Sequence, residues 1–175
     1  MQHSEALKRR DDLANQLTDS NQMPPWIGEE RRTDELSRLC ESILAITADK
    51  DITFICHNIA EEDYNSMVGD VVAFTEDLVI KASLRWRNGD IGAVTVSAFP
   101  RGSITKLEIT AVDPLERETR RRPEWPNRVG ISISLKDATM YLPLPCEAGH
   151  KPTEATETAL IQLLSELASK DLASA

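Results

Sequence analysis

Features that would point to a specific chemistry or to a membrane are missing from this sequence of 175 residues. It has no apolar run of roughly 18 residues, so we expect no transmembrane helix. Residues 1–10 are polar and charged and lack the apolar core of a secretory signal, which predicts a cytoplasmic protein. The seven glycines form neither a glycine-rich phosphate loop nor a strand–GxGxxG–helix motif, which argues against nucleotide-binding chemistry.

Basic residues are fewer than acidic ones, 20 against 29, and the formal net charge is −9. Phosphate backbones and anionic lipids repel such a chain on average, unless it carries a local basic patch. We therefore expect neither nucleic acid nor a membrane among its partners.

The three cysteines, Cys40, Cys56 and Cys146, are an odd number at wide spacing, which predicts buried, reduced thiols and no disulfide framework. Cys56 precedes His57, and Cys146 precedes His150 by four positions, so zinc ligands occur in two pairs. Adjacent residues of a strand point to opposite faces, so Cys56 and His57 do not easily share one metal ion. The second pair supplies only two ligands. We expect no metal site and no cofactor.

Catalytic residue types do not converge in the sequence. Acidic pairs such as Glu61-Glu62 are adjacent and lie in polar surroundings, whereas general acid–base catalysis needs opposed carboxyl groups in different environments. A hydrolase or transferase that uses Cys146 or His150 is an alternative, but no local signature supports it. The sequence therefore leans against an enzyme.

Two helices are predicted before the strands begin. Residues 5–17 follow the capping residue Ser4 and carry a thin apolar stripe. Residues 33–48, with Thr33 as the N-cap, carry a stronger one. The members of the two stripes are Leu7, Leu13 and Leu17 in the first helix, and Leu36, Leu39, Cys40, Ile43 and Leu44 in the second.

Pro24-Pro25 and the polar residues before them separate these helices. Because the first helix has few apolar anchors, we expect 1–27 to be an N-terminal helix and linker that can move. Residues 28–175 are expected to form a single α+β domain.

Short segments with period-two patterning follow. Between 78 and 86, apolar residues alternate with Lys81, Ser83 and Arg85, as in a strand with one buried face. Asn88-Gly89 then predicts a two-residue hairpin turn. We predict a loop or a short helical turn over 59–67. We predict seven strands in all, over 52–58, 69–75, 78–86, 91–99, 104–111, 129–135 and 139–144.

A last helix is predicted after the capping residue Thr153. Its apolar stripe consists of Leu160, Ile161, Leu163, Leu164, Leu167 and Leu172. This much apolar surface must be buried on the sheet or on a partner. The predicted fold class is therefore α+β, with N-terminal helices, a seven-stranded antiparallel sandwich or barrel, and a C-terminal capping helix.

This element order resembles the pleckstrin-homology-like superfold. The likeness is carried by residues 72–80, VAFTEDLVI, and 104–109, ITKLEI, and covers about residues 52 to 171. It implies two packed antiparallel sheets with one open end plugged by the helix. If 59–67 were helical, the order would be similar to the helix-grip fold, which implies a cavity for a lipophilic small molecule. An aromatic content of 5% counts against such a cavity.

Arginines crowd the predicted loop between the fifth and sixth strands. As a candidate partner-binding or anion-binding site it contains Arg117, Arg120, Arg121, Arg122, Trp125 and Arg128. In pleckstrin-like domains that bind phosphoinositides, the basic cluster lies mainly between the first two strands, where this chain has Glu61-Glu62-Asp63. The arginine loop also holds acidic residues, so a solvated loop with internal ion pairs is the alternative.

From these features we expect a non-enzymatic interaction or adaptor module whose two N-terminal helices contact a protein partner. Exposed sheet edges and the second helix also favour a homodimer. The alternative function is a helix-grip protein that binds a lipophilic small molecule.

Overall fold

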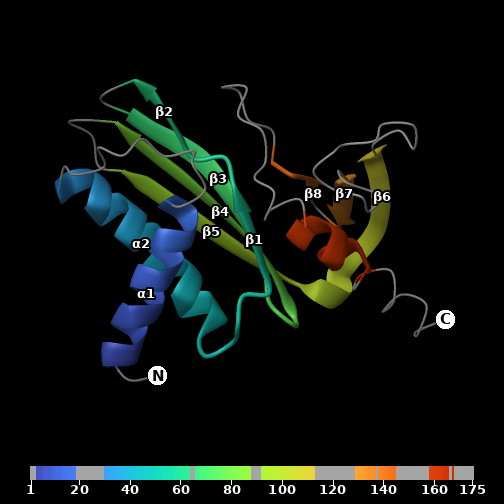
Figure 1. The fold of residues 1–175 in the computed structure, drawn as a ribbon, viewed down its shortest axis with the longest axis horizontal. Helices are drawn as coiled ribbons and strands as arrows, with labels where there is room; N and C mark the ends of the chain where they lie inside the picture. The colour runs from blue at the N-terminus through green and yellow to red at the C-terminus, as the bar shows by residue number, and fades with distance from the viewer. Residues whose placement is uncertain are drawn as a thin grey trace, which may run out of the picture. The chain divides into compact units, whose positions relative to one another are not determined.

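The structure is a computed structural model, and it forms two compact units (Figure 1). The first unit contains the described residues up to Gly102, and the second contains those from Ser103 onward. The residues that the structure describes are 3–18, 30–63, 66–87, 92–112, 129–136, 138–144, 158–165 and 167.

Two helices open the first unit, as predicted: α1 spans His3–Thr18 and α2 spans Glu30–Thr47. Because α2 begins before Thr33, that residue lies inside the helix and is not its cap. All five members of the predicted α2 stripe are buried, and Leu13 and Leu17 of α1 join them in one core cluster. The apolar face of α2 is thus used within the chain, whereas that of α1 is buried only toward its C-terminal end, because Leu7 is exposed.

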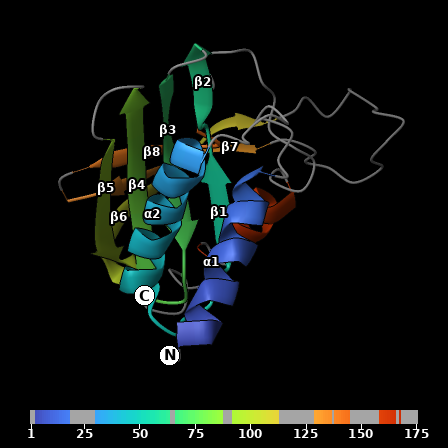
Figure 2. The same ribbon diagram turned by 90° about the vertical axis from the view of Figure 1, so that its left-hand side faces the viewer.

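A five-stranded antiparallel sheet completes the first unit. Its strands are β1 (Phe54–His57), β2 (Ala60–Asp63), β3 (Ser66–Phe74), β4 (Leu78–Arg87) and β5 (Ala93–Pro100). The strand order is β1-β3-β4-β5, and β2 also pairs with β3. Figure 2 shows α2 lying across β4 and β5 with α1 beside it. The core lies between the helices and this face of the sheet, where Val71, Ile80 and Leu84 are almost fully buried.

Thr75, Glu76 and Asp77 form a short turn between β3 and β4. The Thr75 amide donates to the Leu78 carbonyl oxygen at 3.0 Å, and the Leu78 amide donates to Oγ1 of Thr75 at the same distance. Lys50, after α2, forms an ion pair with Asp77. This pair holds the pKa of the Asp77 carboxyl below its usual range, chiefly through the hydrogen bond from Lys50.

Strand β2 differs from the predicted loop or helical turn over 59–67. It forms by pairing with β3, with Ala60 opposite Val68 and a register shift before Asp63. Between β1 and β2 the chain stays beside the same edge of β3, and its backbone approaches Gly69 so closely that a Cβ added there would lie 2.3 Å from Cα of Ile59. Only a glycine fits at this close approach. The helix on which a helix-grip order depends is therefore not formed over 60–63.

Strands β4 and β5 are adjacent and antiparallel, as the predicted hairpin requires, although Asn88-Gly89 itself lies outside the described residues. Arg85 lies opposite Ala93, so an odd number of residues, 86–92, separates the two. If a two-residue turn joined the two strands in an unbroken ladder, the number of residues between two directly opposite positions would be even. The observed register turns Val94 and Val96 toward the helices, where they pack against the core cluster.

The second unit contains a three-stranded antiparallel sheet and a helix. The strands are β6 (Ile104–Val112), β7 (Val129–Leu135) and β8 (Thr139–Leu142), with β7 in the centre. The predicted C-terminal helix is formed over 158–165, and Leu160 and Leu163 in it are buried, as is Leu167 just beyond. Leu172 lies outside the described residues.

The α+β class, with antiparallel sheets, N-terminal helices and a C-terminal helix, is confirmed. All seven predicted strands are present within a few residues of their predicted ends, and β2 is additional. Among the described residues, no helix has the length and apolar character needed to cross a membrane.

Candidate interaction surface

The arginine loop between β6 and β7 lies outside the residues that the structure describes. Its candidate residues Arg117, Arg120, Arg121, Arg122, Trp125 and Arg128 lie outside the described residues, and so do Cys146 and His150.

The described cysteines and the histidine of β1 do not form a reactive or metal-binding group. Cys56 and His57 point to opposite faces of β1, because Cys56 lies opposite Val72 and His57 lies opposite Val71. Burial lowers the pKa of His57 from 6.5 to about 4 and raises the pKa of the Cys40 thiol to about 12. In the part of the chain that the structure describes, no three His, Cys, Asp or Glu residues are grouped as a metal site would require.

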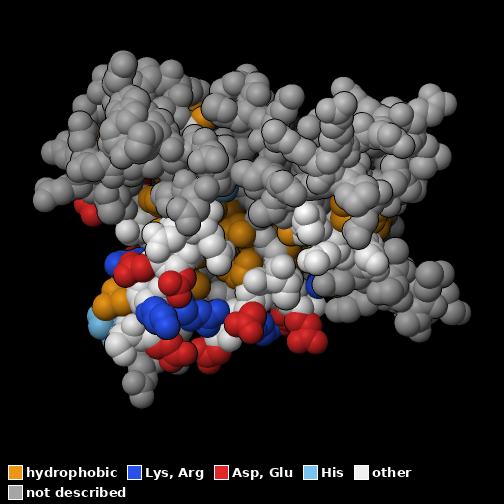
Figure 3. All heavy atoms as spheres, in the orientation of Figure 1, with side chains coloured by type: hydrophobic (Ala, Val, Ile, Leu, Met, Phe, Trp, Pro, Cys, Tyr) orange, Lys and Arg blue, Asp and Glu red, His pale blue; other side chains and the backbone are white. Residues whose placement is uncertain are grey.

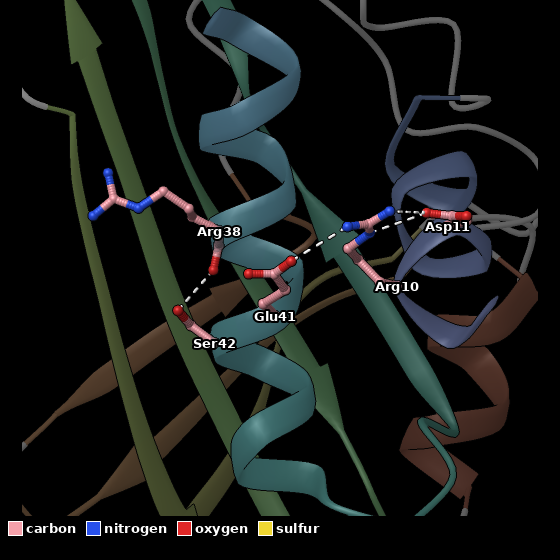
Figure 4. A network of polar contacts seen from close by, with 5 residues as sticks. All are labelled: Arg10, Asp11, Arg38, Glu41 and Ser42. Carbon is pink, nitrogen blue, oxygen red and sulfur yellow. Dashed lines mark hydrogen bonds and ion pairs between the residues drawn. The ribbon is translucent and has the colours of Figure 1, made fainter. Parts of the chain in front are cut away.

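The outer side of the two helices carries charges of both signs. Figure 3 shows acidic and basic side chains mixed over the side where α1 lies. Arg10 donates to Asp11 at 2.8 Å and to Glu41 of α2 at 3.4 Å, whereas Arg38 reaches over the sheet on the other side of α2 (Figure 4). Exposed pairs of this kind contribute little binding or stability. A partner that contacted these helices would meet mixed charges and not an apolar face.

The edges of the two sheets offer a different kind of surface. Among the described residues, β1, β2, β5, β6 and β8 each pair with a single neighbouring strand. A strand edge without a partner presents N–H and C=O groups that another chain can pair with, and natural proteins protect such edges by shortness, charges or bulges. Strand β8 is protected by shortness, since it has four residues, and the edge that β1 and β2 form along β3 is interrupted at residues 58–59.

Strand β6 is long, with nine residues, but it is protected in two other ways. Lys106 and Glu108 lie near its middle and form an ion pair at 2.7 Å. The register with β7 shifts between Ile104 and Lys106 and again between Ile109 and Ala111. Bulges of this kind bend a strand and interrupt the ladder that an added strand would extend.

Strand β5 has none of these protections. It is eight residues long, AVTVSAFP, and contains no charged side chain. Its register with β4 runs without a shift from Ala93 to Pro100. Figure 2 shows it as the outermost strand of the first sheet, beside β4. Of the described edges, β5 is the one open to strand addition along a regular ladder.

The two faces of β5 differ in chemistry. Val94 and Val96 point toward the helices and are half-buried. Thr95 and Ser97 point to the opposite face and are exposed, where they lie next to Ser83 and Lys81 of β4. An added strand would therefore find apolar side chains on one face and hydroxyl groups on the other.

Sequence reasoning predicted this strand but not its position at an edge. The run of small, β-branched and apolar residues is equally typical of a central strand. The absence of charged residues over 93–100 was the sequence feature that could have indicated this surface. Without charged side chains, β5 is not protected against strand addition when it is the outermost strand of the sheet. No family model matches this chain, and no curated protein or solved structure matches it either.

Proposed function

We propose that this chain is a protein-interaction module, not an enzyme, and that strand β5 binds an extended segment of a protein partner by adding it to the first sheet. The observation that carries the proposal is the long, regular and uncharged open edge of β5. The proposal depends on this edge and not on the pleckstrin-homology-like resemblance.

Strand addition suits the chemistry of this edge. Main-chain hydrogen bonds supply affinity in this binding mode, and alternate side chains supply selectivity. A partner with apolar side chains at every second position would cover Val94 and Val96, which α2 leaves half-buried. Polar side chains between them would meet Thr95 and Ser97.

The proposal includes a cytoplasmic location. Cys40 and Cys56 are both buried, and Cys40 is a free thiol. Free thiols are typical of reducing compartments, where disulfides are rare. Fractionation of native cells with an antibody against the chain would test this part.

The test compares two variants with the same added charge. Thr95→Lys with Ser97→Lys places two lysines on the exposed face of β5, a device that blocks edge pairing in natural sheets. Thr139→Lys with Tyr141→Lys places two lysines on the exposed face of β8. Each variant and the wild-type chain would serve as bait in native cell extract, followed by hydrogen–deuterium exchange on the purified complex.

A partner that binds the wild type and the β8 variant but not the β5 variant supports the proposal, provided that the amides of 93–100 gain protection in the complex. A partner retained equally by all three baits, with no protection in β5, contradicts it.

A further inference from the structure

We propose that the open edge of β5 binds the β5 strand of a second copy of this chain, so that the two first sheets continue into one across a two-fold axis. This inference rests on the proposed function, because it names an occupant for the same edge. It is carried by the self-complementarity of β5 and by the regular ladder that β4 imposes on it.

The geometry of a two-fold axis restricts the register. An axis perpendicular to the sheet pairs the strands antiparallel and keeps each face of the sheet on its own side. Residues that pair across the axis must then lie on the same face of the sheet. This holds only if one residue of β5 pairs with the same residue of the second copy at the axis. The candidate centres near the middle of β5 are therefore Thr95, Val96 and Ser97.

Centring on Val96 pairs the whole of 93–99 and gives the best matches. Val96 lies opposite Val96, and Val94 opposite Ala98, on the face that α2 partly covers. Thr95 lies opposite Ser97 twice on the other face. Directly opposite β-branched pairs and Thr–Ser pairs both stabilise antiparallel sheets. No charged side chain lies in the ladder, so two copies of an acidic chain can meet here without local repulsion.

The other two centres fit less well. Centring on Ser97 places Val94 opposite Pro100, and proline lacks the N–H group that a ladder needs. Centring on Thr95 pairs only 93–97 and leaves Phe99 outside the ladder. The sequence of β5 therefore selects a single register.

A second copy also has an advantage over an unstructured peptide. Both β5 strands are already held extended along their full length by β4. Their association does not require the ordering of a flexible backbone, which opposes the binding of a disordered segment. The corresponding pairing of two β6 strands lacks this regularity, because bulges leave only 106–109 in an even ladder.

The experiment uses charge pairs that are specific to the Val96 register. In that register residue 95 of one copy lies opposite residue 97 of the other. The double variants T95K/S97K and T95E/S97E each place like charges opposite each other twice, whereas T95K/S97E places opposite charges there. Light scattering coupled to size exclusion measures the mass of each variant over a concentration series, and T139K/Y141K is the control with the same added charge as T95K/S97K.

We expect the wild type, T95K/S97E and the β8 control to be dimers. The two like-charge variants should dissociate at least about tenfold more readily. An equal mixture of these two variants should form a one-to-one heterodimer, because each lysine then meets a glutamate, and native mass spectrometry resolves that species. Circular dichroism checks folding, and T95E/S97E is the safer variant because the carboxylate introduced by S97E lies opposite Lys81 of β4.

A wild-type chain that remains monomeric at hundreds of micromolar overturns the inference. So does a dimer that persists unchanged in both like-charge variants, since its contact then lies elsewhere. Neither result decides the proposed function. A monomer whose β5 still captures a partner in the bait experiment would keep the function and reject the self-association.

Discussion

Arg9 of α1 donates hydrogen bonds to the carbonyl oxygens of Ala48 and Lys50, which follow the C-terminal end of α2, at 2.9 and 2.6 Å. Ala48 has a positive φ of 51°, the left-handed conformation that ends many helices. The guanidinium thus binds carbonyl oxygens at the negative end of the α2 dipole. One side chain thus joins the two helices through residues that are about forty positions apart in the chain.

Replacement of Arg9 by alanine should lower the free energy of unfolding by about 1 kcal/mol, because two charge-assisted but partly exposed hydrogen bonds are lost. The free energy of unfolding of Arg9→Lys should lie between those of the wild type and Arg9→Ala, since lysine keeps the positive charge but not the two guanidinium nitrogens that donate to the two carbonyl oxygens. Urea unfolding monitored by circular dichroism measures the change. Arg10→Ala is the control, and it should lower the free energy of unfolding less than Arg9→Ala does, because the ion pairs of Arg10 are exposed. Equal effects at the two positions would count against the capping role.

Gly69→Ala should destabilise the first unit by about 2 kcal/mol or more, because the added Cβ would lie 2.3 Å from Cα of Ile59, and backbone cannot move aside as a side chain can. Gly102→Ala is the matched control, since nothing lies within 4 Å of a Cβ at that position, and its effect should stay within about 0.5 kcal/mol. Thermal and urea unfolding of both variants would measure the difference. A neutral Gly69→Ala variant would contradict the close approach of the Ile59 backbone to Gly69.

The stability of the chain should depend on His57 between about pH 6.5 and pH 4. Burial lowers the pKa of His57 to about 4 in the folded chain, so the unfolded state binds a proton first as the pH falls. Stability is therefore unaffected above pH 6.5 and decreases toward pH 4, by at most about 3 kcal/mol. The Asp77 carboxyl, with its lowered pKa, contributes only at lower pH, below its usual value of 3.8.

Urea unfolding of the wild type and of His57→Gln at pH 7, 5.5 and 4.5 tests this dependence. The free energy of unfolding of the wild type should fall relative to that of His57→Gln as the pH falls, because glutamine does not titrate. Parallel pH profiles would mean that His57 is not buried as a neutral side chain.

Cys40 and Cys56 should resist thiol reagents while the chain is folded. Both are buried, and burial raises the pKa of the Cys40 thiol to about 12, so its thiolate fraction at pH 8 is about 1,000-fold below that of an ordinary cysteine. A Cys146→Ser variant removes the remaining cysteine from the assay. Its reaction with a chromogenic disulfide should be slow in buffer and fast in urea. Rapid labelling in buffer would contradict the described burial.

Most of the elements could be predicted because their side-chain patterns are local. The α2 stripe recurs at helical spacing, and Ile80, Ala82 and Leu84 alternate with polar residues of β4, so burial of one face follows directly. Strand β2 escaped prediction because its polar segment has no strand preference of its own. It exists only because β3 offers it a pairing edge.

The sequence by itself determined which segments become helices and strands and which side of α2 and β4 turns inward, because these depend on spacing between near neighbours. The tertiary structure alone decided the rest: that the backbone of Ile59 closely approaches Gly69, that the register of β5 turns Val94 and Val96 toward the helices, and that β5 is outermost. Those outcomes depend on contacts between segments far apart in the chain, and an edge strand and a central strand can share the same local sequence.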